Sequence, residues 1–144
     1  MHSARSERLL GQLSELVKLH RYKVHEKLVN HPELYPGQPP LLFQLDREDG
    51  QTQKSLADKL RRAPATVTVM LKRMETSGYV RREADPNDQR SLRVYLTDQG
   101  RSALKDLSEV FQELELQAQE GFMPEETQLM SELAQRMIHN LRES

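Results

Sequence analysis

Residues 56–100 read LADKLRRAPATVTVMLKRMETSGYVRREADPNDQRSLRVYLTDQG. Apolar residues recur at helical spacing in two segments, and two short runs rich in β-branched and aromatic residues follow them. The stretch therefore predicts a short helix, a turn, a second helix and two strands joined by a polar, basic tip. That order of elements is a winged helix-turn-helix.

The first helix is expected to begin after Thr52, because a threonine hydroxyl at the N-cap accepts a hydrogen bond from a free N–H of the first turn. Leu56, Ala57 and Leu60 then fall on one face of a helix that ends at about Leu60. Residues 61–63 form a short connection to the second helix.

The second helix is expected to begin at Pro64, whose missing N–H costs nothing in a first turn, and to stop at Ser77-Gly78. One stripe at i, i+3, i+4 and i+7 spacing is expected to face inward: Val67, Met70, Leu71 and Met74. The opposite face then carries Ala65, Thr66, Thr68, Val69, Lys72 and Arg73. Small, hydroxylated and basic side chains suit the major groove of duplex DNA, where a Val or Thr methyl can touch a thymine methyl. An ordinary solvated helix surface is the alternative.

The two strands are predicted at residues 79–83 and 93–96, with Asp, Pro and Asn marking residues 84–91 as a turn-rich tip. We expect the two arms to bring four arginines close together: Arg81, Arg82, Arg90 and Arg93. A guanidinium at the end of a hairpin can enter the minor groove of DNA. Asp88 is near enough in sequence to hold the Arg90 guanidinium. A local Asp–Arg pair in a solvated turn, worth ~0–1 kcal/mol, is the alternative.

Four motifs together resemble the MarR family of transcriptional regulators (multiple antibiotic resistance regulators): LADKL, ATVTVMLKRMETSGYVRRE, DPNDQRS and LTDQGR. The resemblance covers about residues 52–101 and continues more weakly into the flanking segments. It implies that Arg90 enters the minor groove and that Asp88 orients it. The outward face of the second helix, the Asp88–Arg90 pair and Arg82 together make up the expected DNA-binding set. Its members are Ala65, Thr66, Thr68, Val69, Lys72, Arg73, Arg82, Asp88 and Arg90. One departure is Ala63-Pro64-Ala65, where many members carry a polar residue that bonds a phosphate.

The flanking sequence predicts further helices at about residues 6–29 and 40–48, another from Thr97 to about Phe122, and a last one from Pro124. Broad apolar stripes on the terminal helices must cover either the protein's own core or a second copy. The chain has few helices with which to cover both terminal stripes by itself, which favours the second copy. The resemblance implies that the first and last helices interlock in a two-fold dimer.

The expected fold is therefore mostly α with a small β-wing, as a single domain over residues 1–144. About 40–100 would form the DNA-binding lobe, and about 6–30 and 101–144 the dimerisation helices.

The net charge of −1 conceals an uneven distribution. Residues 1–53 hold 7 Lys/Arg and 7 Asp/Glu, and residues 94–144 hold 4 and 10. Residues 54–93 hold 10 Lys/Arg against 5 Asp/Glu, a net charge of +5. The positive charge is confined to the segment expected to meet phosphates, which agrees with binding to nucleic acid.

Catalysis and metal binding have no sequence support. The motifs G-x-x-x-x-G-K-[ST], H-E-x-x-H and G-x-S-x-G are missing, so no enzyme activity and no cofactor are expected. His20 and His25 would lie about 140° apart on a helix and make a poor ligand pair. We expect His20 in the core or a pocket, and His25 and His31 in solvent. The lack of cysteine excludes disulfides.

Together these observations favour a cytoplasmic, homodimeric repressor of a pseudo-palindromic DNA site; no apolar run suits a membrane span or signal peptide. The resemblance implies a small-molecule effector between the dimer helices and the DNA-binding lobe, commonly an aromatic acid or another hydrophobic compound. Candidate lining residues are Lys18, His20, Arg21, Tyr22 and Tyr35, although core packing explains most of them equally well. The alternative function is a protein-interaction adaptor, which would not need to neutralise phosphates.

Overall fold

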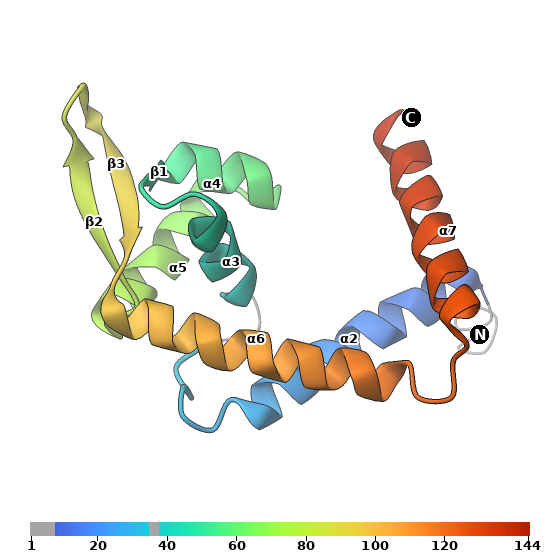
Figure 1. The fold of residues 1–144 in the computed structure, drawn as a ribbon. Coiled ribbons are helices and arrows are strands. Elements are labelled where there is room, and N and C mark those ends of the chain that lie inside the picture. Colours follow the sequence, from blue (N-terminus) through green and yellow to red (C-terminus); the bar gives the residue numbers. More distant parts are fainter. Residues whose placement is uncertain (1–7, 35–37) are drawn as a thin grey trace, which may run out of the picture. The chain divides into compact units, whose positions relative to one another are not determined.

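The computed structural model describes residues 8–34 and 38–144, which form two compact units. The first unit ends at Phe111, and the second runs from Gln112 to Ser144. The described residues contain six helices and one three-stranded antiparallel sheet (Figure 1). This architecture confirms the predicted fold class, a mainly helical chain with a small β-wing.

Three consecutive helices form the centre of the first unit: α3 (Pro39–Arg47), α4 (Gln53–Leu60) and α5 (Pro64–Thr76). The Thr52 hydroxyl caps α4 by accepting a hydrogen bond from the Ser55 N–H at 3.1 Å. Arg61 ends α4 in the left-handed conformation, with φ of 53°. Pro64 occupies the first turn of α5, as predicted.

The end of α5 directs the chain into the wing. Gly78 has φ of 88°, a conformation that costs glycine little. The N–H of Tyr79 donates to the Met74 carbonyl at 2.8 Å, and the N–H of Gly78 donates to the Glu75 carbonyl at 3.0 Å. These two bonds form a Schellman motif, which satisfies carbonyls that the helix end would otherwise leave unpaired.

The sheet has the strand order β1 (Gln51–Thr52), β3 (Asp88–Leu96), β2 (Val80–Asp85). The strands of the wing extend further than predicted, and only Pro86 and Asn87 form the turn. The prediction of an eight-residue tip was wrong. Ala84 pairs with Leu92 and Asp85 pairs with Asp88, so both ends of the predicted tip belong to the strands, although this segment lacks the composition of a strand.

The core of the first unit is built mainly from leucine, valine and methionine side chains of its helices and of strands β2 and β3. They include Leu41, Leu42, Leu45, Leu56, Val67, Leu71, Met74, Val80, Val94 and Leu107. Each buried side chain of this size contributes roughly 1.5–3 kcal/mol to folding. The outer helices of this unit are α2 (Leu9–Lys27) and the first part of α6 (Asp98–Ala118).

Gly100 lies in the first turn of α6, and a Cβ atom there would stand 2.1 Å from the carbonyl oxygen of Tyr79. Close by, the Thr97 hydroxyl donates to the Gly78 carbonyl at 2.5 Å and accepts from the Gly100 N–H at 3.0 Å. The start of α6 is thus held directly against the chain segment that joins α5 to β2.

His31 is buried, with 8% of its surface exposed, so the expectation of a solvated side chain was wrong. Its Nε2 lies 2.7 Å from Asp106 Oδ2 on α6, and its Nδ1 lies 3.2 Å from the Tyr79 hydroxyl. The Tyr79 hydroxyl in turn donates to Glu33 at 3.0 Å. Nothing in the local sequence of His31 reveals partners 48 and 75 residues away.

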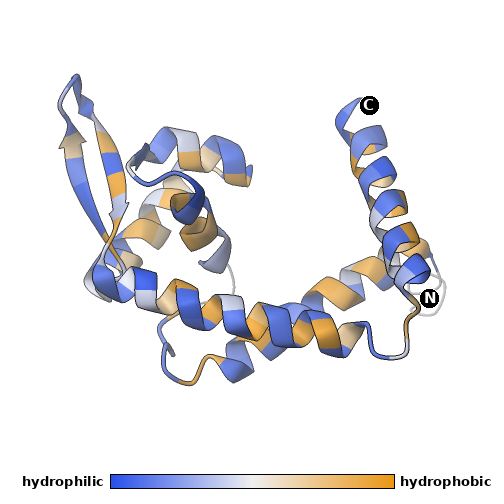
Figure 2. Cartoon of the chain, viewed as in Figure 1, coloured by the Kyte–Doolittle hydropathy of each residue, from blue (hydrophilic) through white to orange (hydrophobic). Residues whose placement is uncertain are grey.

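The second unit comprises the end of α6 and α7 (Pro124–Arg142). The α6 helix stops at Ala118, four residues before the predicted end, and Gly121 adopts φ of 82° in the connection. Along α7, apolar and polar residues alternate (Figure 2). Its exposed apolar side chains are Leu129, Met130, Leu133, Ile138 and Leu141. No helix among the described residues is long and apolar enough to cross a membrane.

Candidate nucleic-acid interface

The helix α5 separates its two faces as its sequence predicts. Val67, Leu71 and Met74 are buried, and Met70 is half-buried. The opposite face contains Ala65, Thr66, Val69, Lys72 and Arg73, which are exposed, and Thr68, which is half-buried. Val69 keeps 52% of its surface in solvent, a large fraction for an apolar residue. At the N-cap, Ala63 provides no side-chain hydrogen bond, in keeping with the departure noted in its sequence.

Thr68 differs from the other outward residues because its hydroxyl is already engaged. The hydroxyl donates to the Pro64 carbonyl at 2.9 Å. It also accepts from Nε2 of Gln53, the first residue of α4, at 3.3 Å. Gln53 was not predicted as part of this face, because the contact joins two helices across 15 residues of sequence.

The Arg82 side chain, on β2, binds the same Gln53 side chain and is only 14% exposed. Its Nη1 donates to Gln53 Oε1 at 3.2 Å, and its Nη2 donates to Glu75 Oε1 at 3.1 Å. The backbone N–H of Arg82 donates to Glu75 Oε2 at 3.0 Å. Hydrogen bonds from Arg82 hold the pKa of Glu75 below its usual value. The arginine thus joins β2 to α4 and α5.

The four wing arginines do not form one cluster, so that expectation was wrong. Successive strand residues point to opposite faces, which separates Arg81 from Arg82. Arg81 forms an ion pair with Glu83, and its guanidinium lies 4.5 Å from the centre of the Tyr95 ring. Arg93 Nη1 donates to the Gly50 carbonyl at 2.7 Å, and Arg93 Nη2 lies 3.3 Å from Asp85 Oδ2.

Asp85 contributes to the turn as well as to that ion pair. Its Oδ1 accepts from the Asn87 N–H at 3.0 Å. This bond first, and Arg93 second, hold the pKa of Asp85 below its usual value. The carboxylate therefore stabilises the turn in its ionised form.

Arg90 lies in a bulge of β3. The register shifts from Ala84↔Leu92 to Asp85↔Asp88, so residues 89–91 have no partner in the β2–β3 pairing. Asp88 Oδ1 accepts from the backbone N–H of Arg90 at 3.0 Å, and among the described residues no ion pair joins Asp88 to the Arg90 guanidinium. The prediction that Asp88 holds the guanidinium is replaced by a main-chain bond that shapes the bulge.

The effector candidates that the structure describes lie on α2, and Tyr35 is outside the described residues. Lys18, Arg21 and Tyr22 are exposed, whereas the His20 ring packs edge-on against Phe111 at 4.8 Å between centroids.

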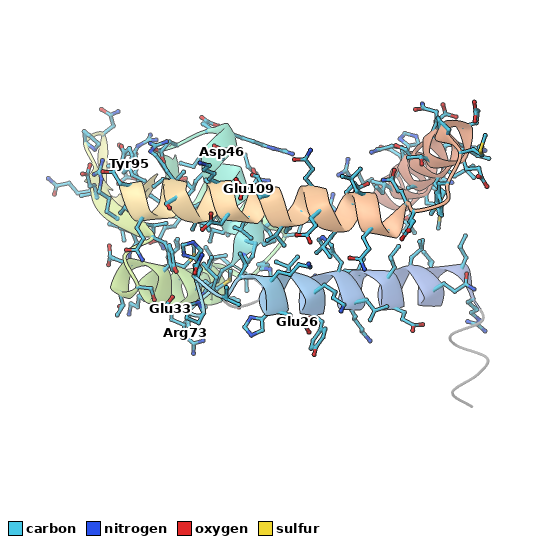
Figure 3. The ribbon with its side chains drawn as sticks, turned by 60° about the horizontal axis from the view of Figure 1, so that its bottom comes forward. Glu26, Glu33, Asp46, Arg73, Tyr95 and Glu109 are labelled. Carbon is cyan, nitrogen blue, oxygen red and sulfur yellow. The ribbon has the colours of Figure 1, made fainter. Side chains whose placement is uncertain are left out.

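A separate open groove of about 470 Å³ is lined by Glu33, Lys72, Arg73, Thr76 and Ser77. Figure 3 shows Glu33 and Arg73 near each other beside α5. None of the proposed effector residues that the structure describes lines this groove.

Several known proteins are similar to this chain in sequence and in fold. Residues 34–92 match the sequence model of the MarR family. The HTH-type transcriptional regulator TtmR of Methylorubrum extorquens (strain PA1) is 38% identical over 79 residues, which are 55% of this chain and 40% of TtmR. The transcriptional regulator HosA of Escherichia coli O111:H- is 29% identical over 128 residues, covering 89% of this chain and 93% of HosA. A crystallised MarR transcriptional regulator from Methanosarcina mazei Go1 is 27% identical, with a TM-score of 0.81 over 92% of this chain and 96% of that chain.

The matched segment, the regulator relatives and the solved structure together support a MarR-family transcriptional regulator. The family resemblance inferred from the sequence is thereby confirmed. The MarR-family relatives are regulators and not enzymes, which agrees with the absence of catalytic motifs. The matched segment spans less than half of TtmR but nearly all of HosA.

Proposed function

We propose that this MarR-family protein is a homodimeric repressor that binds a pseudo-palindromic DNA site and responds to a small molecule. The observation that carries this proposal is the outward face of α5, where Ala65, Thr66 and Val69 are exposed beside Lys72 and Arg73. Such a face can enter the major groove, with small residues near the bases and cations near the phosphates.

The distribution of ion pairs supports a phosphate-binding surface. Residues 54–93 contain five carboxylates, and three of them pair with arginines of the wing. Within residues 54–93, exposed cations with no ion pair to another described residue include Lys54, Arg61, Lys72 and Arg90. They extend from α4 to the wing tip, which is the arrangement expected if α5 lies in the major groove and the wing reaches the minor groove. A protein acting on DNA in this way would work in the cytoplasm.

The exposed apolar side chains of α7 support dimerisation through the terminal segments, about residues 6–30 and 101–144. On α2, Leu9, Leu10, Leu16, Val17 and Leu19 are each about half exposed as well. Burial of apolar surface contributes roughly 25 cal/mol per Å², so a second copy that covers these helices would be strongly stabilised. Two-fold symmetry would then place two α5 helices on one face of the duplex.

The proposed effector is an aromatic acid or another hydrophobic compound. Support comes from the aromatic side chains between the helices of the first unit, where His20 contacts Phe111 and Phe43 lies 5.0 Å from Phe111. An aromatic ligand could stack against such side chains. Isothermal titration with benzoate and salicylate, with and without the His20→Ala change, tests this part of the proposal.

Salt-dependent binding to random duplex DNA tests the DNA-binding function and separates it from the adaptor alternative. A repressor must release counterions, so its affinity should fall steeply between 50 and 200 mM salt. Lys72→Ala should reduce the slope of log K against log salt by ~0.9 per subunit. Lys105→Ala on α6, also exposed, is the matched control and should leave the slope unchanged. Affinity that does not vary with salt would favour the adaptor.

A further inference from the structure

A series of hydrogen bonds with defined donors and acceptors fixes the orientation of the Thr68 hydroxyl. The Arg82 guanidinium can only donate, so the Gln53 oxygen must face it, at 3.2 Å. The Gln53 amide nitrogen therefore faces Thr68 and donates to its hydroxyl oxygen at 3.3 Å. The single hydroxyl hydrogen of Thr68 is given to the Pro64 carbonyl at 2.9 Å.

These hydrogen bonds leave the Thr68 side chain without a free donor for a base. It cannot donate to O6 or N7 of guanine, or to O4 of thymine. Because the hydroxyl is turned toward α4 and the helix backbone, the Cγ2 methyl occupies a different staggered position on the same Cβ atom. The methyl is therefore the part of the Thr68 side chain left to contact a base, next to Val69, which is 52% exposed, and one turn after the exposed Ala65.

The geometry points to Thr68 as a residue that recognises the C5 methyl group of thymine, with Gln53 and Arg82 as the residues that position it. The inference rests on the proposed DNA-binding function and specifies its chemistry at the centre of α5. Thr66 provides the internal contrast, since its hydroxyl has no hydrogen-bond partner among the described residues and stays available to a base or a phosphate.

The first measurement needs no variant. A preferred site is obtained by binding-site selection with the full chain, and each thymine in it is then replaced in turn by uracil, which removes only the C5 methyl. The wild-type protein should lose about fourfold in affinity per half-site at the contacted thymine, the ratio that corresponds to burying one methyl-sized group.

Two substitutions then separate the contribution of the Thr68 hydroxyl to binding from that of its methyl. Thr68→Val keeps the Cγ2 methyl and puts a second methyl in place of the hydroxyl. Valine has one strongly preferred χ1 rotamer in a helix, so its methyl stays in place without the Gln53 bond. This variant should therefore retain the affinity, within twofold, and also the loss of affinity on replacing thymine by uracil. Thr68→Ser keeps the hydroxyl and removes the methyl, so it should bind the thymine and uracil sites equally. Gln53→Met should reduce the uracil penalty by releasing the Thr68 side chain. Thr66→Val is the control and should leave the penalty unchanged.

The thymine-to-uracil ratio is insensitive to a general loss of folded protein, because both sites are measured with the same sample. A full penalty in Thr68→Ser, a loss of the penalty in Thr68→Val, or a selected site without any uracil penalty would each overturn the inference while leaving DNA binding in place. Failure of the wild-type protein to select any site would instead refute the proposed function.

Discussion

The imidazole of His31 connects α6 to the segment that enters the wing, with Nε2 2.7 Å from Asp106 Oδ2 and Nδ1 3.2 Å from the Tyr79 hydroxyl. Both ring nitrogens are engaged, and the ring is 8% exposed. Buried hydrogen-bonded groups of this kind fix one arrangement of the elements that they join, because an unpaired alternative costs more than in water. The start of the wing is thereby tied to α6.

Replacing His31 should destabilise the first unit. His31→Leu removes both hydrogen bonds, and we expect the free energy of unfolding to fall by ~1–3 kcal/mol. Urea unfolding followed by circular dichroism measures the change. His25→Leu is the matched control, since His25 is exposed and its replacement should change stability by less than ~0.5 kcal/mol. Equal effects of the two substitutions would show that the buried network contributes nothing.

Tyr79 should make stability fall at alkaline pH. Burial first, and the hydrogen bond to Glu33 second, raise the pKa of Tyr79 to about 12. The folded state therefore favours the neutral phenol, whose stabilisation is complete below pH ~10 and is lost as the pH rises toward the folded pKa. The loss from this group should be on the order of 2–3 kcal/mol.

Tyr79→Phe tests this pH dependence because it lacks the titrating hydroxyl. The difference in unfolding free energy between wild type and Tyr79→Phe should narrow between pH 9 and pH 12. Urea unfolding at each pH gives that difference, and Tyr22→Phe, at an exposed side chain, serves as the control. Parallel pH profiles for wild type and Tyr79→Phe would contradict the prediction.

The wing should act through Arg90, with Asp88 acting through the main chain. Arg90→Ala should weaken operator binding by ~1–3 kcal/mol, and most at sites with A·T-rich flanks, because a minor-groove arginine responds to groove width. Asp88→Ala should give a smaller loss. Asp88→Asn separates two explanations, since its amide oxygen can still accept the Arg90 N–H while its charge is gone. Near-wild-type binding by Asp88→Asn is expected; a loss as large as in Asp88→Ala would favour a guanidinium contact.

The apolar face of α7 should be required for assembly. Leu133→Glu places a charge at a position that is 43% exposed in the single chain, so folding should be little affected. Sedimentation should show monomers, because burying an unpaired carboxylate in an interface costs several kcal/mol. Glu132→Gln on the neighbouring exposed position is the control and should remain dimeric. A dimeric Leu133→Glu protein would place the interface elsewhere.

Features set by local rules could be predicted from the sequence. The Thr52 cap, Pro64 in the first turn of α5 and Gly78 at its end each depend on residues within one turn of the chain. The buried stripe of α5 follows from helical periodicity alone. These signals together were sufficient for the winged helix and for the outward face of α5.

Features set by distant contacts could not be predicted. Gln53 is an ordinary helix residue until folding places it between Thr68 and Arg82. Arg82 was expected in a cluster of wing arginines, yet its side chain is only 14% exposed, because it binds Glu75 at the end of α5 and Gln53 on α4. The bulge at Arg90 depends on how two strands pair, and residues 85–91 taken alone suggest only a turn.

Gly100 sets a limit on how this protein can vary. With the Tyr79 carbonyl only 2.1 Å from any Cβ atom, even alanine would force the first turn of α6 away from the wing. In a saturation-mutagenesis library screened only for soluble, folded chains, glycine should be the one survivor at this codon. The same screen should accept many residues at Lys72 and Arg90, which only a screen for repression would restrict. Comparing the two screens would sort positions into those required by space inside the molecule and those required by its target.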